Sequence, residues 1–334
     1  MSILFNKFIF YIKSFIKFIL FFLNKKKLVN ELNENIRFLS IETTNVCNAN
    51  CIFCAYQYQS RPTGLMDMNL FEKVVEQYAQ NNVGNINLTP TVGEPLADKY
   101  LLKRIKFIKK FKNIKKIGIY TNLISLKNFD LKEFISSGLT DLGVSASGFD
   151  KDMYERVYRS KMYPKVYNNL INLLKINNEL GRPINITVDL RSDLSLSETF
   201  NLPDQKKLLE YTTKDKFFYK FRYDNWGGKI KQNDLIGIMK LRNKFNLNFN
   251  NIRVSPCSEF FSGPHVYWNG DVGICGCRDV DAKELIIGSV KDPDTNINHV
   301  WANKKREKLI DEFISSPRSI CTNCSHYNNL SVFN

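Results

Sequence analysis

The stretch Cys47-Asn48-Ala49-Asn50-Cys51-Ile52-Phe53-Cys54 places three cysteines on one short segment, directly after a strand-like run at 37–43. The histidines of the chain, His265, His299 and His326, all lie far from it. Three soft thiolate ligands on one loop favour an iron–sulfur cluster. Three cysteines leave one iron of a four-iron cluster without a protein ligand, and that iron can bind a substrate or a cofactor.

This cysteine triplet could instead form a structural zinc site or a disulfide. Structural zinc sites close with four ligands, usually as two CxxC-like pairs, whereas this loop offers three. Disulfides form in oxidising compartments, and nothing in the sequence points to secretion. We therefore expect Cys47, Cys51 and Cys54 to hold an iron–sulfur cluster.

The CxxxCxxC spacing, with Phe53 before the third cysteine, resembles the signature of the radical S-adenosylmethionine (SAM) superfamily. Other segments follow in that family's order. Residues 87–95 resemble its strand ending in GGEP, with Val92 in place of the first glycine. Residues 119–122 resemble its third strand, which often ends in TNG, with Leu123 replacing the glycine, and residues 142–148 resemble its fourth strand. The resemblance covers residues 36–325.

Strand-like and helix-like segments alternate from residue 36 onward. The candidate strands are 37–43, 85–91, 116–121, 141–146, 184–190 and 217–223. The candidate helices are 69–82, 98–112, 128–137, 150–180 and 203–213. This alternation predicts βαβ units and a parallel sheet. Six repeats match the partial (β/α)6 TIM-type barrel that the resemblance implies, so we expect an α/β fold.

The candidate strands alternate between an apolar set of residues and a small or polar set. In a barrel, one set faces the helices and the other faces the lumen. The apolar set is Ile86, Leu88, Ile117, Ile119, Leu142, Val144, Ile186, Val188, Leu190, Phe217, Tyr219 and Phe221. The other set is Glu42, Thr44, Asn87, Thr89, Thr91, Gly118, Tyr120, Asn122, Gly143, Ser145, Ser147, Thr187, Asp189, Arg191, Lys220, Arg222 and Asp224. Because bulky branched side chains fill a solid barrel core, this polar set predicts an open, wet lumen. A barrel with a few satisfied internal ion pairs is the alternative.

The remaining cysteines, Cys257, Cys275, Cys277, Cys321 and Cys324, all lie in the last quarter of the chain. Their order resembles the Twitch form of the SPASM-type auxiliary-cluster domain, where a hairpin gives two ligands and a later helix and loop give two more. The resemblance implies one auxiliary [4Fe–4S] cluster on Cys257, Cys321, Cys324 and a fourth cysteine. Cys275 and Cys277 compete for the fourth place, and the spacing favours Cys275. A zinc ribbon is the alternative.

The resemblance also implies residues that contact SAM. Gly93 and Glu94 correspond to contacts with its methionine amino group, and Ser145 to a contact with its ribose or carboxylate. Phe53 and Tyr56 border the adenine or the cluster. The candidate cofactor-binding set is Phe53, Tyr56, Gly93, Glu94, Asn122 and Ser145. Each has a structural alternative. Gly93 and Glu94 could form a plain turn, and Ser145 could simply hydrogen-bond within the barrel. Phe53 and Tyr56 could serve packing alone.

Charged residues at the ends of the last barrel strands are candidates for gripping a substrate. They are Asp189, Arg191, Arg222 and Asp224. Structural salt bridges would account for the same residues equally well.

The first thirty residues contain six lysines and neither Asp nor Glu. Their polar positions fall on one stripe of a helix whose other face is Phe, Ile, Leu and Tyr. Such a basic amphipathic helix can lie at a membrane surface. A transmembrane span is less favourable, because it would place Lys13 near the bilayer centre. A signal peptide would need a cleavage site, and none is clear here. A helix packed on the protein itself is the remaining alternative.

These observations predict three domains. They are an amphipathic helix at 1–30, a radical SAM barrel at 36–228, and a small α+β SPASM/Twitch domain at 229–334. We expect a cytoplasmic enzyme that is peripheral at the inner face of the membrane. The net charge of +15 permits nucleic-acid binding, and a zinc-ribbon nucleic-acid-binding protein is a rival, but we expect no nucleic acid because the chain has a general lysine-rich composition.

The resemblance implies a radical SAM oxidoreductase that forms a 5′-deoxyadenosyl radical and removes a hydrogen atom from a polar substrate. An auxiliary cluster would then take the substrate electron, as in the radical dehydrogenases of aminoglycoside pathways, so the substrate is an alcohol on a sugar, cyclitol or glycan. The cofactors are SAM and [4Fe–4S] clusters, and flavodoxin or ferredoxin is the expected electron donor. A radical SAM maturase that modifies a peptide or protein is the alternative.

Overall fold

The computed structural model describes residues 36–242, 255–276 and 278–328, together with isolated residues between 12 and 31. The strands are β1 (Phe38–Ile41), β2 (Gly84–Asn87), β3 (Ile114–Thr121), β4 (Asp141–Ala146), β5 (Asn185–Arg191), β6 (Phe217–Lys220), β7 (Arg222–Tyr223), β8 (Lys240–Leu241), β9 (His265–Val266), β10 (Asp271–Gly273) and β11 (Ile286–Ser289). The α-helices are α2 (Met68–Asn81), α3 (Leu101–Ile108), α4 (Leu131–Ile135), α5 (Lys151–Tyr158), α6 (Tyr163–Glu179), α7 (Leu196–Asn201), α8 (Pro203–Leu208), α9 (Ile297–Trp301), α10 (Lys304–Ser315) and α11 (Ser319–Asn323).

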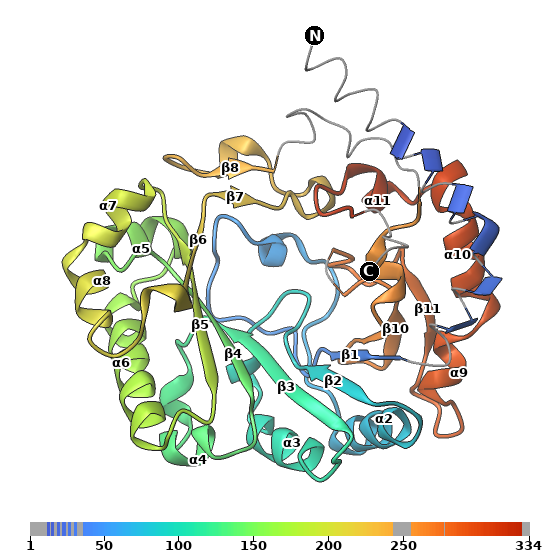
Figure 1. The fold of residues 1–334 in the computed structure, drawn as a ribbon, viewed down its shortest axis with the longest axis horizontal. Coiled ribbons are helices and arrows are strands. Elements are labelled where there is room, and N and C mark those ends of the chain that lie inside the picture. The colour runs from blue at the N-terminus through green and yellow to red at the C-terminus, as the bar shows by residue number, and fades with distance from the viewer. Residues whose placement is uncertain are drawn as a thin grey trace.

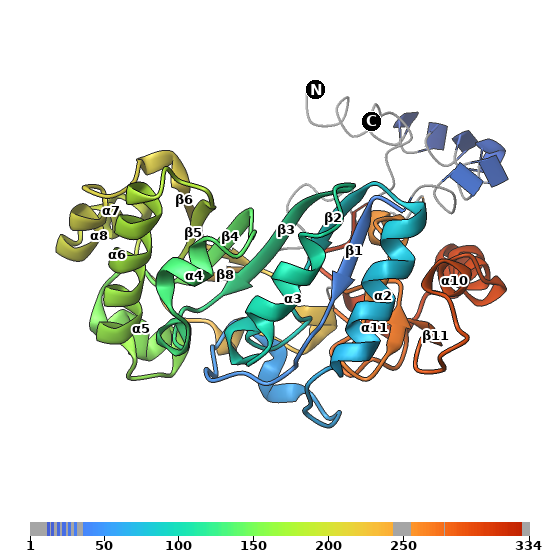
Figure 2. The same cartoon turned by 90° about the horizontal axis from the view of Figure 1, so that it is seen from below.

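One sheet runs through both halves of the chain in the order β11-β10-β9-β1-β2-β3-β4-β5-β6. The strands β1 to β6 are parallel, β9 is parallel to β1, and β10 is antiparallel to its neighbours. The strands form an open arc, and α2, α3, α4 and α6 cover its outer face (Figures 1 and 2). This arrangement confirms the α/β fold with a partial barrel followed by a small C-terminal part.

The apolar set on the second to fifth predicted strands forms the core between sheet and helices. Ile86, Leu88, Leu142, Val144 and Leu190 are all buried, as are the other members of the set in these strands. Burial of each such side chain contributes about 1.5–3 kcal/mol to folding. The pattern fails at the sixth strand, where Phe221 is 40% exposed. There the predicted strand 217–223 divides, because β7 leaves the main sheet and pairs with β8 in a separate ribbon.

Other predicted boundaries differ from the structure for local reasons. The predicted helix 150–180 is two helices, because Arg159 adopts a left-handed conformation (φ 49°) and a proline in the first turn begins α6. The predicted strand 85–91 ends at Asn87, whose side chain accepts from the backbone and hydroxyl of Thr89. Helix α7 has no counterpart among the predicted helices, although Ser195 and Glu198 form a capping box there.

The amphipathic helix predicted for residues 1–30 falls mostly outside the described residues, and so does Cys277. Both stay predictions, as do the three domain boundaries. In the described part of the chain, no helix combines the length and the apolar character needed to cross a lipid bilayer.

Candidate active site

A cavity of about 600 Å³ lies within the arc of strands and reaches the C-terminal part of the chain. It is lined by all three front cysteines and by nine of the ten other candidate residues. These nine are Phe53, Gly93, Glu94, Asn122, Ser145, Asp189, Arg191, Arg222 and Asp224. Tyr56 does not line this cavity, and its hydroxyl accepts from the backbone N–H of Cys47 at 3.1 Å. Its contact with the adenine or the cluster stays a prediction.

The polar set of strand residues surrounds open space, as the sequence predicts. A second cavity of about 430 Å³ lies along the same strands and includes Gly118, Gly143 and Thr187. Asn87, Thr89 and Tyr120 line both cavities. Glu42, Thr44 and Ser147 belong to the polar set but line neither cavity.

The front cysteines sit on a loop that other segments hold in place. The backbone N–H of Ile52 donates to the carbonyl of Val157 at 3.0 Å, and the N–H of Cys54 donates to the carbonyl of Cys51 at 3.1 Å. All three cysteines are half-buried. Burial raises the pKa of the Cys47 thiol to about 12, so metal binding must displace its proton. Three thiols around one side of a polar cavity are a donor set that fits a three-cysteine [4Fe–4S] cluster.

Gly93 and Glu94 lie in the segment that follows β2. Gly93 has φ 144°, and a Cβ there would lie 3.0 Å from the Cα of Asn45, so the site requires glycine. The buried Glu94 carboxylate accepts from the backbone of Leu96 and Asn122 at 3.0 and 2.8 Å and from Thr121. Burial raises the pKa of Glu94 to about 7. Because its oxygens already have protein donors, a SAM contact for this side chain stays a proposal.

Asn122 connects β3 to the cysteine loop. Its side-chain amide donates to Oδ1 of Asn48, between Cys47 and Cys51, at 2.8 Å. Its own Oδ1 accepts from the backbone N–H of Ile124 at 2.9 Å. Asn122 therefore fixes the loop as well as lining the cavity.

Arg191 is the central cation of the cavity wall. Its Nε donates to Ser145 at 2.9 Å, and its guanidinium lies 4.6 Å from the ring centroid of Phe53. Asp189 lies 3.7 Å from Arg191, which is the salt bridge that the sequence left as an alternative. Ser145 also exchanges a hydrogen bond of 2.9 Å with Tyr158. Sequence reasoning missed Tyr158, because its position inside a helical pattern gave no sign that it faces the strands.

Four of the late cysteines line a third, smaller cavity. Cys257, Cys275, Cys321 and Cys324 come from three separate segments and surround about 20 Å³. Four thiols around one cavity are the donor set of a [4Fe–4S] cluster. Among the described residues, no group of three or more His, Cys, Asp and Glu side chains is placed to hold a single metal ion.

The main cavity and the small cavity lined by the late cysteines share a wall. Glu259, Arg278 and His326 line both of them. Arg278 Nε lies 2.6 Å from Asp224 Oδ1, and its guanidinium lies 4.7 Å from the ring centroid of Trp226. Trp226 Nε1 in turn donates to the carbonyl of Phe53, the neighbour of Cys54, at 2.9 Å. The sequence carries no signal for this connection between the cysteine regions.

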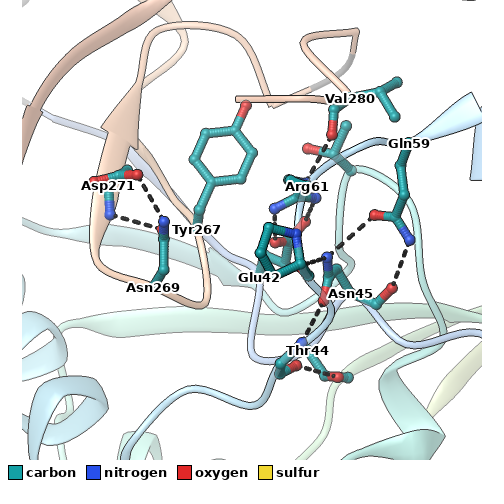
Figure 3. A network of polar contacts seen from close by, with 12 residues as sticks. Glu42, Thr44, Asn45, Gln59, Arg61, Tyr267, Asn269, Asp271 and Val280 are labelled. Carbon is teal, nitrogen blue, oxygen red and sulfur yellow. Dashed lines mark hydrogen bonds and ion pairs between the residues drawn. The ribbon is translucent and has the colours of Figure 1, made fainter. Parts of the chain in front are cut away.

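A buried ion pair fixes the loop that follows the front cysteines (Figure 3). Arg61 donates to both oxygens of Glu42 at 2.5 and 2.7 Å, directly after β1. Arg61 also donates to the carbonyl of Val280 at 2.7 Å and lies 5.0 Å from the ring centroid of Tyr267. Asn45 completes the network by donating to Gln59 at 3.1 Å. Arg61 thus joins the barrel, the cysteine loop and the C-terminal part.

We expect Arg61→Ala to lower the free energy of unfolding by about 3–5 kcal/mol, because it leaves the Glu42 carboxylate buried without its partner. The side chains of Arg61 and Glu42 are only 8% and 0% exposed. Lys106→Ala is the matched control, since its pair with Glu133 is about half exposed and is worth about 0–1 kcal/mol. Urea denaturation of the reconstituted protein measures both, and equal losses would contradict the structural role of Arg61.

Two family profiles match the chain. The radical SAM superfamily matches residues 41–192, and an iron–sulfur cluster-binding domain, SPASM, matches residues 257–325. The chain belongs to the radical SAM superfamily. This radical SAM enzyme uses [4Fe–4S] clusters and SAM, and the two matches contain all seven of the described cysteines that line the cavities.

Curated relatives of the radical SAM enzyme include the GTP 3′,8-cyclase of Pasteurella multocida, 25% identical over 219 residues, which are 63% of this chain and 63% of that protein. Molybdenum cofactor biosynthesis protein moc-5 of Caenorhabditis elegans is 28% identical over 179 residues, covering 48% of this chain and 29% of that protein. The chain spans less than two thirds of the length of these relatives.

Solved structures share the fold of the radical SAM enzyme. BtrN in complex with AdoMet and 2-DOIA has a TM-score of 0.54 and 19% identity, over 90% of this chain and 95% of that one. SuiB of Streptococcus suis, bound to precursor peptide SuiA, has a TM-score of 0.59 and 16% identity, over 90% and 73%. These neighbours confirm the fold, a partial barrel followed by a small C-terminal part.

Proposed function

We propose that this radical SAM enzyme dehydrogenates an alcohol on a polar substrate, such as a sugar, a cyclitol or a glycan-linked alcohol. The observation that carries the proposal is the wall of Glu259, Arg278 and His326 shared by the two cysteine-lined cavities. A substrate held against this wall has one cysteine region on each side. Such a placement suits a reaction that uses two redox centres on one molecule.

The overall change is the removal of two hydrogens from a secondary alcohol to give a carbonyl. When bound, SAM and its cluster supply a 5′-deoxyadenosyl radical that accepts a hydrogen atom, and the auxiliary cluster supplies an acceptor for the remaining electron. In this proposal, Cys47, Cys51 and Cys54 hold the first cluster. Cys257, Cys275, Cys321 and Cys324 hold the second.

The residues of the chain bind the alcohol and move its proton. Asp189 lies on the cavity wall between Arg191 at 3.7 Å and Lys220 at 3.5 Å. We assign Asp189 as the acceptor of the hydroxyl proton, and Arg191 as the donor that orients the alcohol oxygen. Phe53 lies under the Arg191 guanidinium and limits the directions in which that donor can turn.

The reaction test uses enzyme reconstituted without oxygen, a reductant and a panel of sugars, cyclitols, peptides and GTP. We expect one 5′-deoxyadenosine and one methionine for each carbonyl formed on a polyhydroxylated substrate. Deuterium at the oxidised carbon should appear in 5′-deoxyadenosine by mass spectrometry. Modification of a peptide alone would favour the maturase alternative, and cyclised GTP would place the enzyme with its curated relatives. Reduced flavodoxin or ferredoxin should replace the chemical reductant.

We infer from the sequence pattern of residues 1–30 that the enzyme is cytoplasmic and binds the inner face of the membrane peripherally. Six lysines with no acidic residue favour anionic lipid headgroups. Sedimentation with phosphatidylserine vesicles measures this, and loss of binding is expected on deletion of residues 1–28. Equal sedimentation of both forms would contradict it.

A further inference from the structure

Two arginines lie at the exposed end of the main cavity. Arg222 belongs to β7 and Arg242 directly follows β8, the two strands of the separate ribbon near the top of Figure 1. The backbone N–H of Arg242 donates to the carbonyl of Tyr223 at 2.7 Å, so the ribbon holds the two arginines on adjoining strands. Both residues are exposed and both line the cavity. Neither is needed to build the core.

Most other charges of the cavity are already paired. Asp189 lies between Arg191 and Lys220, and Asp224 is paired with Arg278. Among the described residues, no carboxylate lies within ion-pair distance of Arg222 or Arg242. Arg242 contacts His326 Nδ1 at 3.1 Å, and the Arg222 guanidinium lies over the ring of Phe221. Glu259 also lines the cavity and lies 3.8 Å from Nε2 of the same histidine. The two arginines still leave positive charge at the mouth that a ligand can offset.

We propose that the substrate carries a phosphoryl group, which Arg222 and Arg242 bind at the mouth while the alcohol reaches the deeper Arg191. This inference rests on the proposed function for the identity of the alcohol. Two guanidinium groups match the two charges and the several oxygens of a phosphate monoester, whereas one arginine suffices for a carboxylate. The substrate class is thus a phosphorylated sugar, cyclitol or glycan. The chain's net charge of +15 also draws such anions toward the protein.

The depth of the cavity supports this placement. Arg191 is largely buried, with 20% of its side chain exposed, and contacts Ser145 beside the cysteine loop. Arg222 and Arg242, by contrast, are exposed where they line the same cavity. A phosphate at the mouth retains part of its hydration, so the free-energy cost of its desolvation stays small. A phosphate bound there also determines which hydroxyl of the substrate enters the barrel.

Binding of three matched probes tests the proposal without requiring turnover. Glycerol 3-phosphate, glycerate and glycerol are titrated into the SAM-loaded holoenzyme by calorimetry at fixed ionic strength. We expect glycerol 3-phosphate to bind at least tenfold more tightly than glycerate, and glycerol to bind more weakly still. Arg222→Gln and Arg242→Gln should each weaken glycerol 3-phosphate binding by about tenfold or more, since each removes a charged hydrogen-bond donor.

Lys240→Gln is the matched control, because Lys240 is exposed opposite Arg222 in the ribbon but does not line the cavity. It should leave the binding of glycerol 3-phosphate within about twofold, as expected for general screening of surface charge. Equal binding of all three probes, tighter binding of glycerate, or equal losses in all three variants would overturn the proposal.

The outcomes separate this inference from the proposed function. One outcome is that phosphate binding depends on both arginines but no phosphorylated alcohol is oxidised. This result would contradict the dehydrogenase activity and support the anion site. Oxidation of a phosphorylated alcohol with the same kcat/KM by wild type, Arg222→Gln and Arg242→Gln would contradict the anion site and leave the dehydrogenase supported.

Discussion

Replacing Cys47, Cys51 or Cys54 by Ala is expected to abolish the formation of 5′-deoxyadenosine from SAM. Each variant removes one of the three thiols on the loop, and a cluster held by two thiolates has no stable way to keep its open iron for SAM. Chromatography of the products after anaerobic reconstitution and reduction measures this loss. Iron content should fall by about four atoms per chain, the number in one such cluster.

A loss of activity alone does not separate the missing cluster from a misfolded loop. The carbonyl of Cys51 accepts from Cys54 within the loop, and these backbone contacts survive a change of side chain. Circular dichroism should therefore match wild type. A variant that retains its fold and still cleaves SAM would show that the three cysteines do not hold the cluster.

Replacing Cys257 or Cys321 by Ala is expected to stop substrate oxidation while largely sparing SAM cleavage. Both cysteines line the smaller cavity, and neither lines the main one. Iron content should fall from about eight to about four atoms per chain if both clusters are of the four-iron type. Parallel measurement of 5′-deoxyadenosine and carbonyl product separates the two activities.

Cys277→Ala is the matched control for the late cysteines. Cys275 lies with the other three around the smaller cavity, so the variant at Cys277 should keep its iron and its product. Loss of four irons from Cys277→Ala, with none lost from Cys275→Ala, would reverse the assignment of the fourth ligand. Loss of SAM cleavage in Cys321→Ala would contradict the separate roles of the two regions.

The fold was predictable wherever one strand or helix carries its own pattern. Strand β4 lies at 141–146 as expected, because Leu142 and Val144 alternate with small polar residues over the whole strand. Errors came where a single side chain ends an element. Asn87 ends β2 by bonding to Thr89, and Arg159 divides a long helix by its left-handed backbone. The periodicity of apolar residues gives no sign that a single side chain will end a strand or a helix.

The lining of the candidate site could be predicted from two sequence patterns, which are the spacing of the cysteines and the polar residues near the strand ends. Its connections could not be predicted. Arg61 meets Glu42 and Val280, and Trp226 meets Phe53, only because the chain folds back over long sequence distances. No periodic pattern encodes such contacts. For Tyr56 the structure adds a backbone partner, Cys47, that the sequence did not indicate, and its contact with the adenine or the cluster stays a prediction.

The position of β1 has a consequence for how the protein is made. This strand pairs with β2 on one side and, through Ser40 and His265, with β9 on the other. The ribosome releases β9 more than 200 residues after β1, so one edge of β1 stays unpaired while that part of the chain is made. Unpaired strand edges invite aggregation, and distant pairings form slowly. Production of the protein should therefore benefit from slower synthesis or from chaperones that cover nascent chains.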